Sequence, residues 1–225
     1  MHKQPYASKK AMPSTKFPTN VYAEMTPNPA TMKFVVDRKL VSGLHQLDFH
    51  NVKEALVCSP LAAELFNFPF VVGVFISGKI VSVTKDESLG WEMIVMQLRE
   101  YIREWLVENE FAVEEDKISE LSALGGGVDQ EIKSAASIEK LLESKNISPS
   151  EYDKQIGDLL NEFVRPAVEQ DGGAIDFVGF NDGIVYVQLR GACAGCPSST
   201  ETLKGGIETL LTSKIEDVNE VVAIA

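Results

Sequence analysis

Two cysteines three residues apart are the residues of this chain best suited to chemistry. They lie in the segment Gly191-Ala-Cys193-Ala-Gly-Cys196-Pro197. This spacing lets two sulfur atoms converge on one metal-sized object, and the small neighbouring residues let the backbone approach it closely. Pro197 removes one N–H group and limits how far the loop can move. The segment therefore predicts either metal binding or thiol redox chemistry.

The position of the pair favours the thiolate form. Residues Ser198-Ser-Thr-Glu201 have the form of a capping box, so a helix should begin just after Cys196. A helix start carries unpaired N–H groups and a partial positive charge, and both stabilise a thiolate, which is the form that binds metal. The same N–H groups can donate hydrogen bonds to the sulfur atoms of an anionic cluster.

Three kinds of site fit the pair: a reversible disulfide, a zinc site and an iron–sulfur site. The region is short for a thioredoxin fold, and no aromatic residue directly precedes Cys193. Structural zinc sites and cubane clusters use four protein ligands. None of the three histidines lies in this part of the chain (His2, His45 and His50). Two ligands per chain imply two chains facing each other across a twofold axis.

The third cysteine, Cys58, belongs to another part of the chain, and we expect it to be a small buried hydrophobe. Three cysteines are too few, and odd in number, for a disulfide framework. A close cysteine pair without such a framework is typical of a reducing compartment. We therefore expect a cytoplasmic protein.

The composition narrows the class of protein. The chain has 225 residues, of which 44% are hydrophobic and 24% charged, as in ordinary globular proteins. Its net charge of -12 argues against nucleic-acid and anionic membrane partners. No stretch reaches the roughly 18 apolar residues of a membrane span. Residues 1–21 are basic and lack an apolar core, so we interpret them as a disordered tail and not as a targeting segment.

Residues 22–109 predict a small α+β domain. The turn-rich element Thr26-Pro-Asn-Pro29 precedes a strand at residues 32–36. Apolar spacing predicts a helix over residues 52–66. A hairpin follows at residues 70–84, with Gly78 in its turn. Residues 91–107 predict a second helix, whose apolar stripe consists of Ile94, Leu98, Ile102 and Leu106.

Residues 110–147 are rich in acidic residues and glycine, and we interpret them as a flexible, solvated linker. The linker should let the domains on either side move relative to each other. The overall fold class is therefore α+β, with two small domains joined by an acidic linker.

Residues 148–225 predict the second α+β domain. A helix should begin at the capping box Ser148-Pro-Ser-Glu151, with Pro166 kinking or ending it and Gly172-Gly173 stopping it. Its buried stripe should contain Ile156, Leu159, Leu160, Phe163 and Ala167. Strands should follow at residues 175–180 and 184–190, with a last strand at 218–224.

The helix after the cysteine loop should bury Leu203, Ile207, Leu210 and Leu211. It also contains Lys204-Gly-Gly206, and each glycine there lowers helix propensity by about 1 kcal/mol. Either close packing against the loop or a partner subunit requires these glycines, or the helix merely tolerates them.

The pattern around the cysteines resembles the NifU C-terminal-like domain family. The resemblance rests on Val164-Arg-Pro-Ala-Val168, Asp171-Gly-Gly173, Leu189 to Ser199 and Thr202-Leu-Lys-Gly-Gly-Ile207. The first domain resembles the N-terminal domain of Nfu proteins through Thr26-Pro-Asn-Pro29, Lys33-Phe34, Ser59-Pro-Leu-Ala62 and Val72-Gly-Val-Phe75. The two matches span most of the chain outside the tail and linker.

The resemblance implies a scaffold or carrier and not an enzyme. Such a protein binds a 4Fe–4S cluster at a homodimer interface, here through Cys193 and Cys196, and transfers it to apo-proteins. Its partners are apo iron–sulfur client proteins and cluster assembly proteins. The alternative from the residues alone is a dithiol/disulfide oxidoreductase that uses the same pair.

Overall fold

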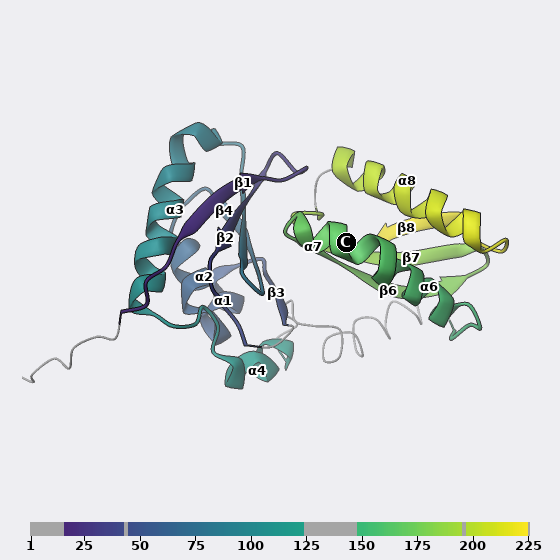
Figure 1. The fold of residues 1–225 in the computed structure, drawn as a ribbon, viewed down its shortest axis with the longest axis horizontal. Coiled ribbons are helices and arrows are strands. Elements are labelled where there is room, and N and C mark those ends of the chain that lie inside the picture. Colours follow the sequence, from purple (N-terminus) through teal and green to yellow (C-terminus); the bar gives the residue numbers. More distant parts are fainter. Residues whose placement is uncertain (1–15, 43–44, 124–147, 195–196, 225) are drawn as a thin grey trace, which may run out of the picture.

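The structure, a computed structural model, describes residues 16–42, 45–123, 148–194 and 197–224, without the side chains of 122–123 and 197–199. It contains two sheets, each with its own helices and hydrophobic core (Figure 1). The α+β fold class with two domains is confirmed. None of the described helices is both long and apolar enough to span a bilayer.

The N-terminal domain is built on a five-stranded antiparallel sheet with the order β1-β2-β5-β4-β3. The strands are β1 Val21–Met25, β2 Thr31–Val36, β3 Gln46–Phe49, β4 Val71–Ser77 and β5 Ile80–Lys85. The predicted hairpin is β4–β5, and Gly78 in its turn has a φ of 54°, which glycine adopts without steric cost. The predicted strand at 32–36 is β2.

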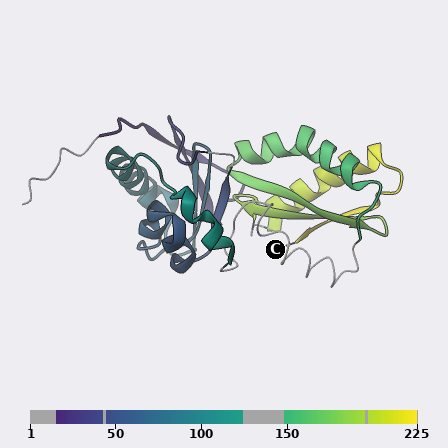
Figure 2. The ribbon, with the colours of Figure 1, turned by 90° about the horizontal axis from the view of Figure 1, so that it is seen from below.

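One face of this sheet is covered by helices α1 Val52–Cys58, α2 Pro60–Leu65 and α3 Trp91–Glu108 (Figures 1 and 2). The buried residues of α3 are the four predicted ones. The single helix predicted at 52–66 is wrong, because the chain breaks at Ser59. This residue precedes a proline, which disfavours the helical conformation before it, and its hydroxyl caps α2 by accepting from Ala62 N.

The N-terminal domain extends beyond residue 109. Residues 110–123 contain the short helices η1 Glu115–Lys117 and α4 Ile118–Ala123. Four of their apolar side chains are in the domain core (Ala112, Val113, Ile118 and Leu121). The expectation that this segment is solvated linker is therefore wrong, because these four side chains fix it to the core, although Phe111 is 43% exposed. The rest of the predicted linker, residues 124–147, lies outside the described residues.

Part of the predicted tail also contacts this domain. Phe17 N donates to Val107 O at 2.7 Å, and the guanidinium of Arg38 lies 5.5 Å from the centre of the Phe17 ring. Packing against the domain therefore begins before the predicted boundary at residue 22. Residues 1–15 lie outside the described residues.

The C-terminal domain has a three-stranded sheet with the order β6-β7-β8. Strands β6 Gly173–Asn181 and β7 Ile184–Gly191 form a hairpin, and β8 Glu220–Ile224 pairs with β7 in parallel. One sheet face is covered by α8 Pro197–Lys214 and by a long helical segment (Figure 2). This segment consists of α6 Asp153–Leu159, the π-helix η2 Leu160–Val164 and α7 Arg165–Gln170.

Two predictions for the long helical segment are wrong. The helix begins at Asp153 and not beside Pro149, and its N-cap is Tyr152. In the turn before it, the Ser150 hydroxyl donates to Asp153 Oδ1 at 2.7 Å and accepts from Tyr152 N at 3.2 Å. Of the predicted buried stripe, Phe163 is 52% exposed and Ala167 is also exposed, while Val164 and Val168 are buried. The π-helix explains the change of face, because it adds one residue to a turn just before Pro166, which cannot donate a helical hydrogen bond.

Candidate metal centre

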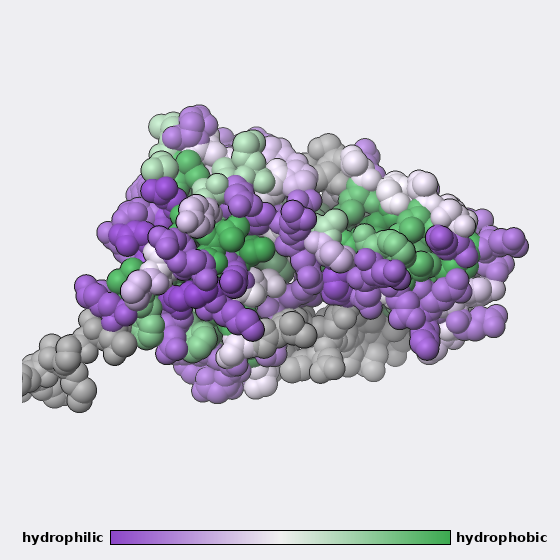
Figure 3. Space-filling model, viewed as in Figure 1, coloured by the Kyte–Doolittle hydropathy of each residue, from purple (hydrophilic) through white to green (hydrophobic). Residues whose placement is uncertain are grey.

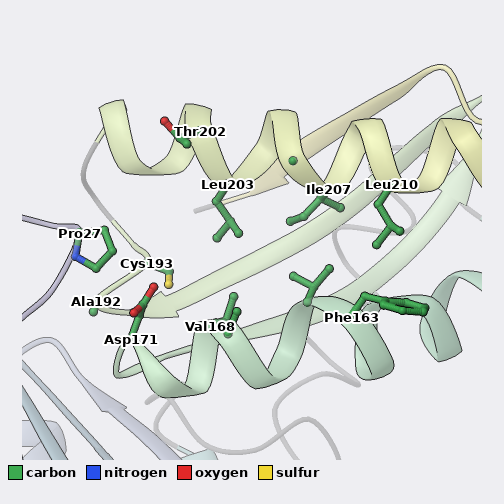
Figure 4. A pocket seen from close by; sticks show the side chains of 13 residues that line it. Pro27, Phe163, Val168, Asp171, Ala192, Cys193, Thr202, Leu203, Ile207 and Leu210 are labelled. Atoms are coloured by element: carbon green, nitrogen blue, oxygen red, sulfur yellow. The ribbon is translucent and has the colours of Figure 1, made fainter.

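Cys193 lies on a short loop between the end of β7 and the start of α8 (Figure 4). Gly191, with a φ of 62°, turns the chain out of β7, and its carbonyl accepts from Ala194 N at 3.1 Å. Pro197 occupies the first position of α8, where a missing N–H group costs no helical hydrogen bond. The helix therefore begins before the predicted capping residue Ser198. Cys196 lies outside the described residues, so its approach to Cys193 stays a prediction.

The Cys193 thiol is largely withdrawn from solvent. The residue is 8% exposed and packs in the core of the C-terminal domain. Burial raises the pKa of the thiol to about 11, and the negative charge of Asp171 adds to the rise. At neutral pH the free thiol is therefore protonated, so the expectation that the helix start favours the thiolate is wrong for Cys193, because burial outweighs it. A metal that binds the thiol must displace the proton.

The predicted helix stop at Gly172-Gly173 is confirmed, and each glycine has a separate role. Gly172 follows α7 with a φ of 80°, as expected of a residue that ends a helix. A Cβ on Gly173 would lie 2.8 Å from Cys193 Sγ and 2.8 Å from the carbonyl oxygen of Arg190. Because Gly173 has no side chain, the Cys193 thiol can occupy this space. In the sequence this role has no local signal other than the second glycine of the pair.

An apolar groove leads away from the thiol. It has a volume of about 610 Å³ and runs between α7 and α8, with Cys193, Asp171 and Pro27 at one end (Figure 4). The exposed ring of Phe163 lies toward the other end. In the space-filling view the groove is a hydrophobic band across the C-terminal domain (Figure 3). Of the predicted stripe on α8, Ile207 and Leu211 are buried and Leu203 and Leu210 are partly exposed; Leu203, Ile207 and Leu210 line the groove.

The two glycines of α8 are not required by packing within the chain. A Cβ on Gly205 or Gly206 would meet nothing within 4 Å outside the helix's own nearby backbone. Gly206 lines the groove beside the cysteine loop, but Gly205 does not. The structure therefore leaves room at Gly206 for a second molecule.

This difference gives a testable prediction. Changing either glycine to alanine should stabilise the apo chain by about 0.5–1 kcal/mol, because alanine has the higher helix propensity. Gly206→Ala should in addition lower the yield of iron-loaded dimer, because its methyl group enters the groove; thermal unfolding and iron analysis measure the two effects. Gly205→Ala is the matched control. Equal iron loading of both variants would show that α8 faces no second chain at Gly206.

The remaining candidate ligands lie apart from Cys193. Cys58 is fully buried in the N-terminal core, as predicted, and burial raises the pKa of its thiol to about 11. His45 and His50 also belong to the N-terminal domain. Within the described ranges, three or more His, Cys, Asp or Glu side chains nowhere gather in a way that could hold a metal ion.

Two family models match the chain, one on each domain. Residues 156–222 match the NifU-like domain, and residues 21–109 match the family described as scaffold protein Nfu/NifU N terminal. The cysteine loop and the groove helices α7 and α8 lie within the first match. The N-terminal sheet lies within the second.

Curated relatives match over nearly the whole chain. "NifU-like protein 4, mitochondrial" of Arabidopsis thaliana is 32% identical over 89% of this chain and 64% of its own length. "NifU-like protein 5, mitochondrial" of the same plant is 31% identical over 96% of this chain and 74% of its own length. "NFU1 iron-sulfur cluster scaffold homolog, mitochondrial" of Homo sapiens is 31% identical over 89% of this chain and 70% of its own length. The chain thus spans less than two thirds of the first relative.

The expectation of a cytoplasmic protein is contradicted by these relatives, because all three are named mitochondrial. The expectation rested on the lack of a disulfide framework. That observation indicates a reducing compartment, and it does not distinguish the cytosol from other reducing compartments.

Proposed function

Because the chain belongs to the family of NifU-like and Nfu proteins, we propose that it is a carrier for an iron–sulfur cluster, which it holds through Cys193 and Cys196 and delivers to apo-proteins. One observation carries the proposal: the only described thiol of the NifU-like domain lies at one end of an apolar groove, on the loop that leads into α8. The name of the human relative contains the words iron-sulfur cluster scaffold.

We propose that the cargo is a 4Fe–4S cluster shared by two copies of the chain. A cubane cluster takes four thiolate ligands, and the Cys-x-x-Cys segment supplies two per chain. The N–H groups at the start of α8 favour negative charge at the cluster. The groove beside Cys193 is large enough for side chains of a facing copy. A site between two chains is easy to open, which suits transfer better than storage.

The chemistry of Cys193 favours a carrier over the alternative dithiol/disulfide oxidoreductase. Cysteines that attack disulfides usually have a lowered pKa and partial exposure. Cys193 is buried, and the pKa of its thiol is raised. A metal ligand tolerates this environment, because metal binding itself removes the proton. We therefore propose that the chain catalyses no reaction of its own.

The partners that follow are apo iron–sulfur proteins and cluster assembly proteins. We propose that they are met in mitochondria, as the names of the relatives suggest.

A transfer experiment tests the carrier function. The full chain, loaded anaerobically with iron and sulfide, is mixed with an apo-enzyme that needs a 4Fe–4S cluster, in the presence of an iron chelator. We expect enzyme activity to return together with loss of the carrier's visible absorption. Activity that returns no faster than with free iron and sulfide under the same chelator would contradict a carrier role.

A further inference from the structure

The face of the N-terminal sheet opposite its helices is closed by the C-terminal domain (Figures 1 and 2). Side chains alternate between the two faces of a strand. In β2, Phe34 and Val36 pack on the helices, while Lys33 points to the other face, where its Nζ donates to Gln170 O at 2.6 Å. In β5, Ser82 lies on the same outer face and donates to Gly172 O at 2.8 Å.

The strands β3 and β4 continue this contact. Asp48 accepts from Gly191 N at 3.2 Å, and Gln46 Nε2 donates to Glu169 Oε1 at 2.9 Å. The carbonyl of Gln46 accepts from Arg190 Nη1 at 3.1 Å. The contacted residues fall in two segments, 169–172 and 190–194. The second segment contains Cys193, and the first directly precedes Gly173, which lies against Cys193 Sγ.

The side chains of the outer sheet face that take part in this contact are buried. Lys33, Gln46, Asp48 and Ser82 are all 8% exposed or less, although they are polar. Phe75 is 2% exposed, yet among the described residues it packs in none of the hydrophobic clusters. Its ring instead lies against Gly191, where a Cβ would come within 2.8 Å of it. Without the C-terminal domain, this ring would be exposed on a polar sheet face.

The turn between β1 and β2 reaches the cysteine loop itself. Asn28 is 2% exposed, and its Nδ2 donates to Ala194 O at 3.1 Å. Its Oδ1 accepts from Ala30 N at 2.9 Å, which holds the turn in shape. Pro27 forms part of the groove wall at the Cys193 end (Figure 4). A second chain that approaches Cys193 must therefore pass this turn.

We propose that the outer face of the N-terminal sheet, with the 26–29 turn, is a docking surface for the cysteine-loop end of the same chain's C-terminal domain, and that the docked form guards the loop against a second copy. The surface uses three elements without a role in cluster binding, which are the turn Thr26-Pro-Asn-Pro29, Lys33 and Phe75. The docking is a property of the apo chain. The guarding of cluster assembly rests on the proposed function.

A pair of isosteric substitutions tests the docking. Asn28→Asp keeps the acceptor for Ala30 N and turns the donor to Ala194 O into a repelling oxygen. Gln46→Met, of similar shape, removes the donor to Glu169 and the acceptor for Arg190 Nη2. A matched control makes one charged and one neutral change within the N-terminal domain: Asn109→Asp loses a donor to Trp105 O, and Asn67→Leu loses a donor to Glu64.

The readouts use the full apo chain, by small-angle scattering and by deuterium uptake in the peptide that contains residues 190–194. Each lost hydrogen bond is worth roughly twofold to tenfold in the docking equilibrium. We therefore expect the interface variant to have a larger radius of gyration and about tenfold faster uptake than the control. Ser82→Ala, a milder variant, should shift both in the same direction. Equal values in the wild type, the interface variant and the control would overturn the docking.

Anaerobic loading with iron and sulfide then tests the guarding. The interface variant should form iron-loaded dimer faster than the control does. If the interface variant is undocked but takes up iron at the control's rate, the proposal that docking guards the loop is overturned, while the docking itself stands. A wild-type chain that takes up no iron would instead count against the proposed function, while scattering and uptake would still decide the docking.

Discussion

Cys193→Ser should abolish cluster binding, with bound iron falling from about four atoms per dimer to near zero. The reason is that each chain offers two thiolates, so the variant dimer has only two of the four ligands. Cys196→Ser should have the same effect. Iron and sulfide analysis after anaerobic reconstitution, with the visible spectrum as a second record, measures the loss.

Cys58→Ala is the matched control for these variants. Cys58 is fully buried in the N-terminal core and does not line the groove that contains Cys193. The control should therefore keep its full iron content and lose only a little thermal stability. Loss of the cluster in the Cys58 variant, or its retention in the Cys193 variant, would show that the ligands are assigned wrongly.

Asp176→Ala should lower the free energy of unfolding of the C-terminal domain by about 3–5 kcal/mol. The Asp176 carboxylate lies 2.6 Å from Arg190 Nη2, and the two side chains are 4% and 9% exposed. Removing the carboxylate leaves the guanidinium buried without its counter-charge. Urea unfolding followed by circular dichroism measures the loss. The damage should extend to the cysteine loop, because Arg190 is three residues from Cys193.

The double variant Asp176→Leu/Arg190→Met is the control for this prediction, because replacing a buried ion pair by apolar residues is often close to neutral. It should recover most of the stability that Asp176→Ala loses. If Asp176→Ala costs less than about 1 kcal/mol, in the range of a surface pair, the pair is effectively solvated and the account of its burial is wrong.

Elements with a strong local pattern were predicted well. The stripe of α3 and the β4–β5 turn at Gly78 were confirmed, because helical spacing and a glycine turn are properties of neighbouring residues. The break at Ser59 had a local signal in Pro60, which the apolar spacing outweighed in the prediction. Pro166 signalled an irregularity in the first helix of the C-terminal domain but not its form, a π-helix that moved Phe163 from the predicted core to the surface.

Because residues 110–123 are rich in acidic residues, their composition did not indicate that they belong to the N-terminal domain. Residues 110–123 contain many carboxylates, which point to solvent, while Ala112 and Leu121 are fully buried. Average composition describes a segment as a whole, whereas packing selects individual side chains. A few apolar residues among many charges are enough to fix such a segment to a core.

The candidate site was predicted only in part, because some of its features are long-range. Spacing and helix placement were enough to single out Cys193. The space left by Gly173, the groove and the contact of Asn28 with Ala194 depend on segments far apart in the sequence. The one sequence hint of docking was an aromatic residue, Phe75, on a sheet face that is otherwise polar.

The central claim is that two chains share one cluster through their Cys193/Cys196 pairs. The most direct test is anaerobic reconstitution of the full chain, followed by iron, sulfide and mass determination on one sample. We predict about four iron and four sulfide per dimer, with the apo chain mainly monomeric. A loaded monomer with its own complete cluster, or no bound iron together with a readily cycling Cys193–Cys196 disulfide, would contradict the claim.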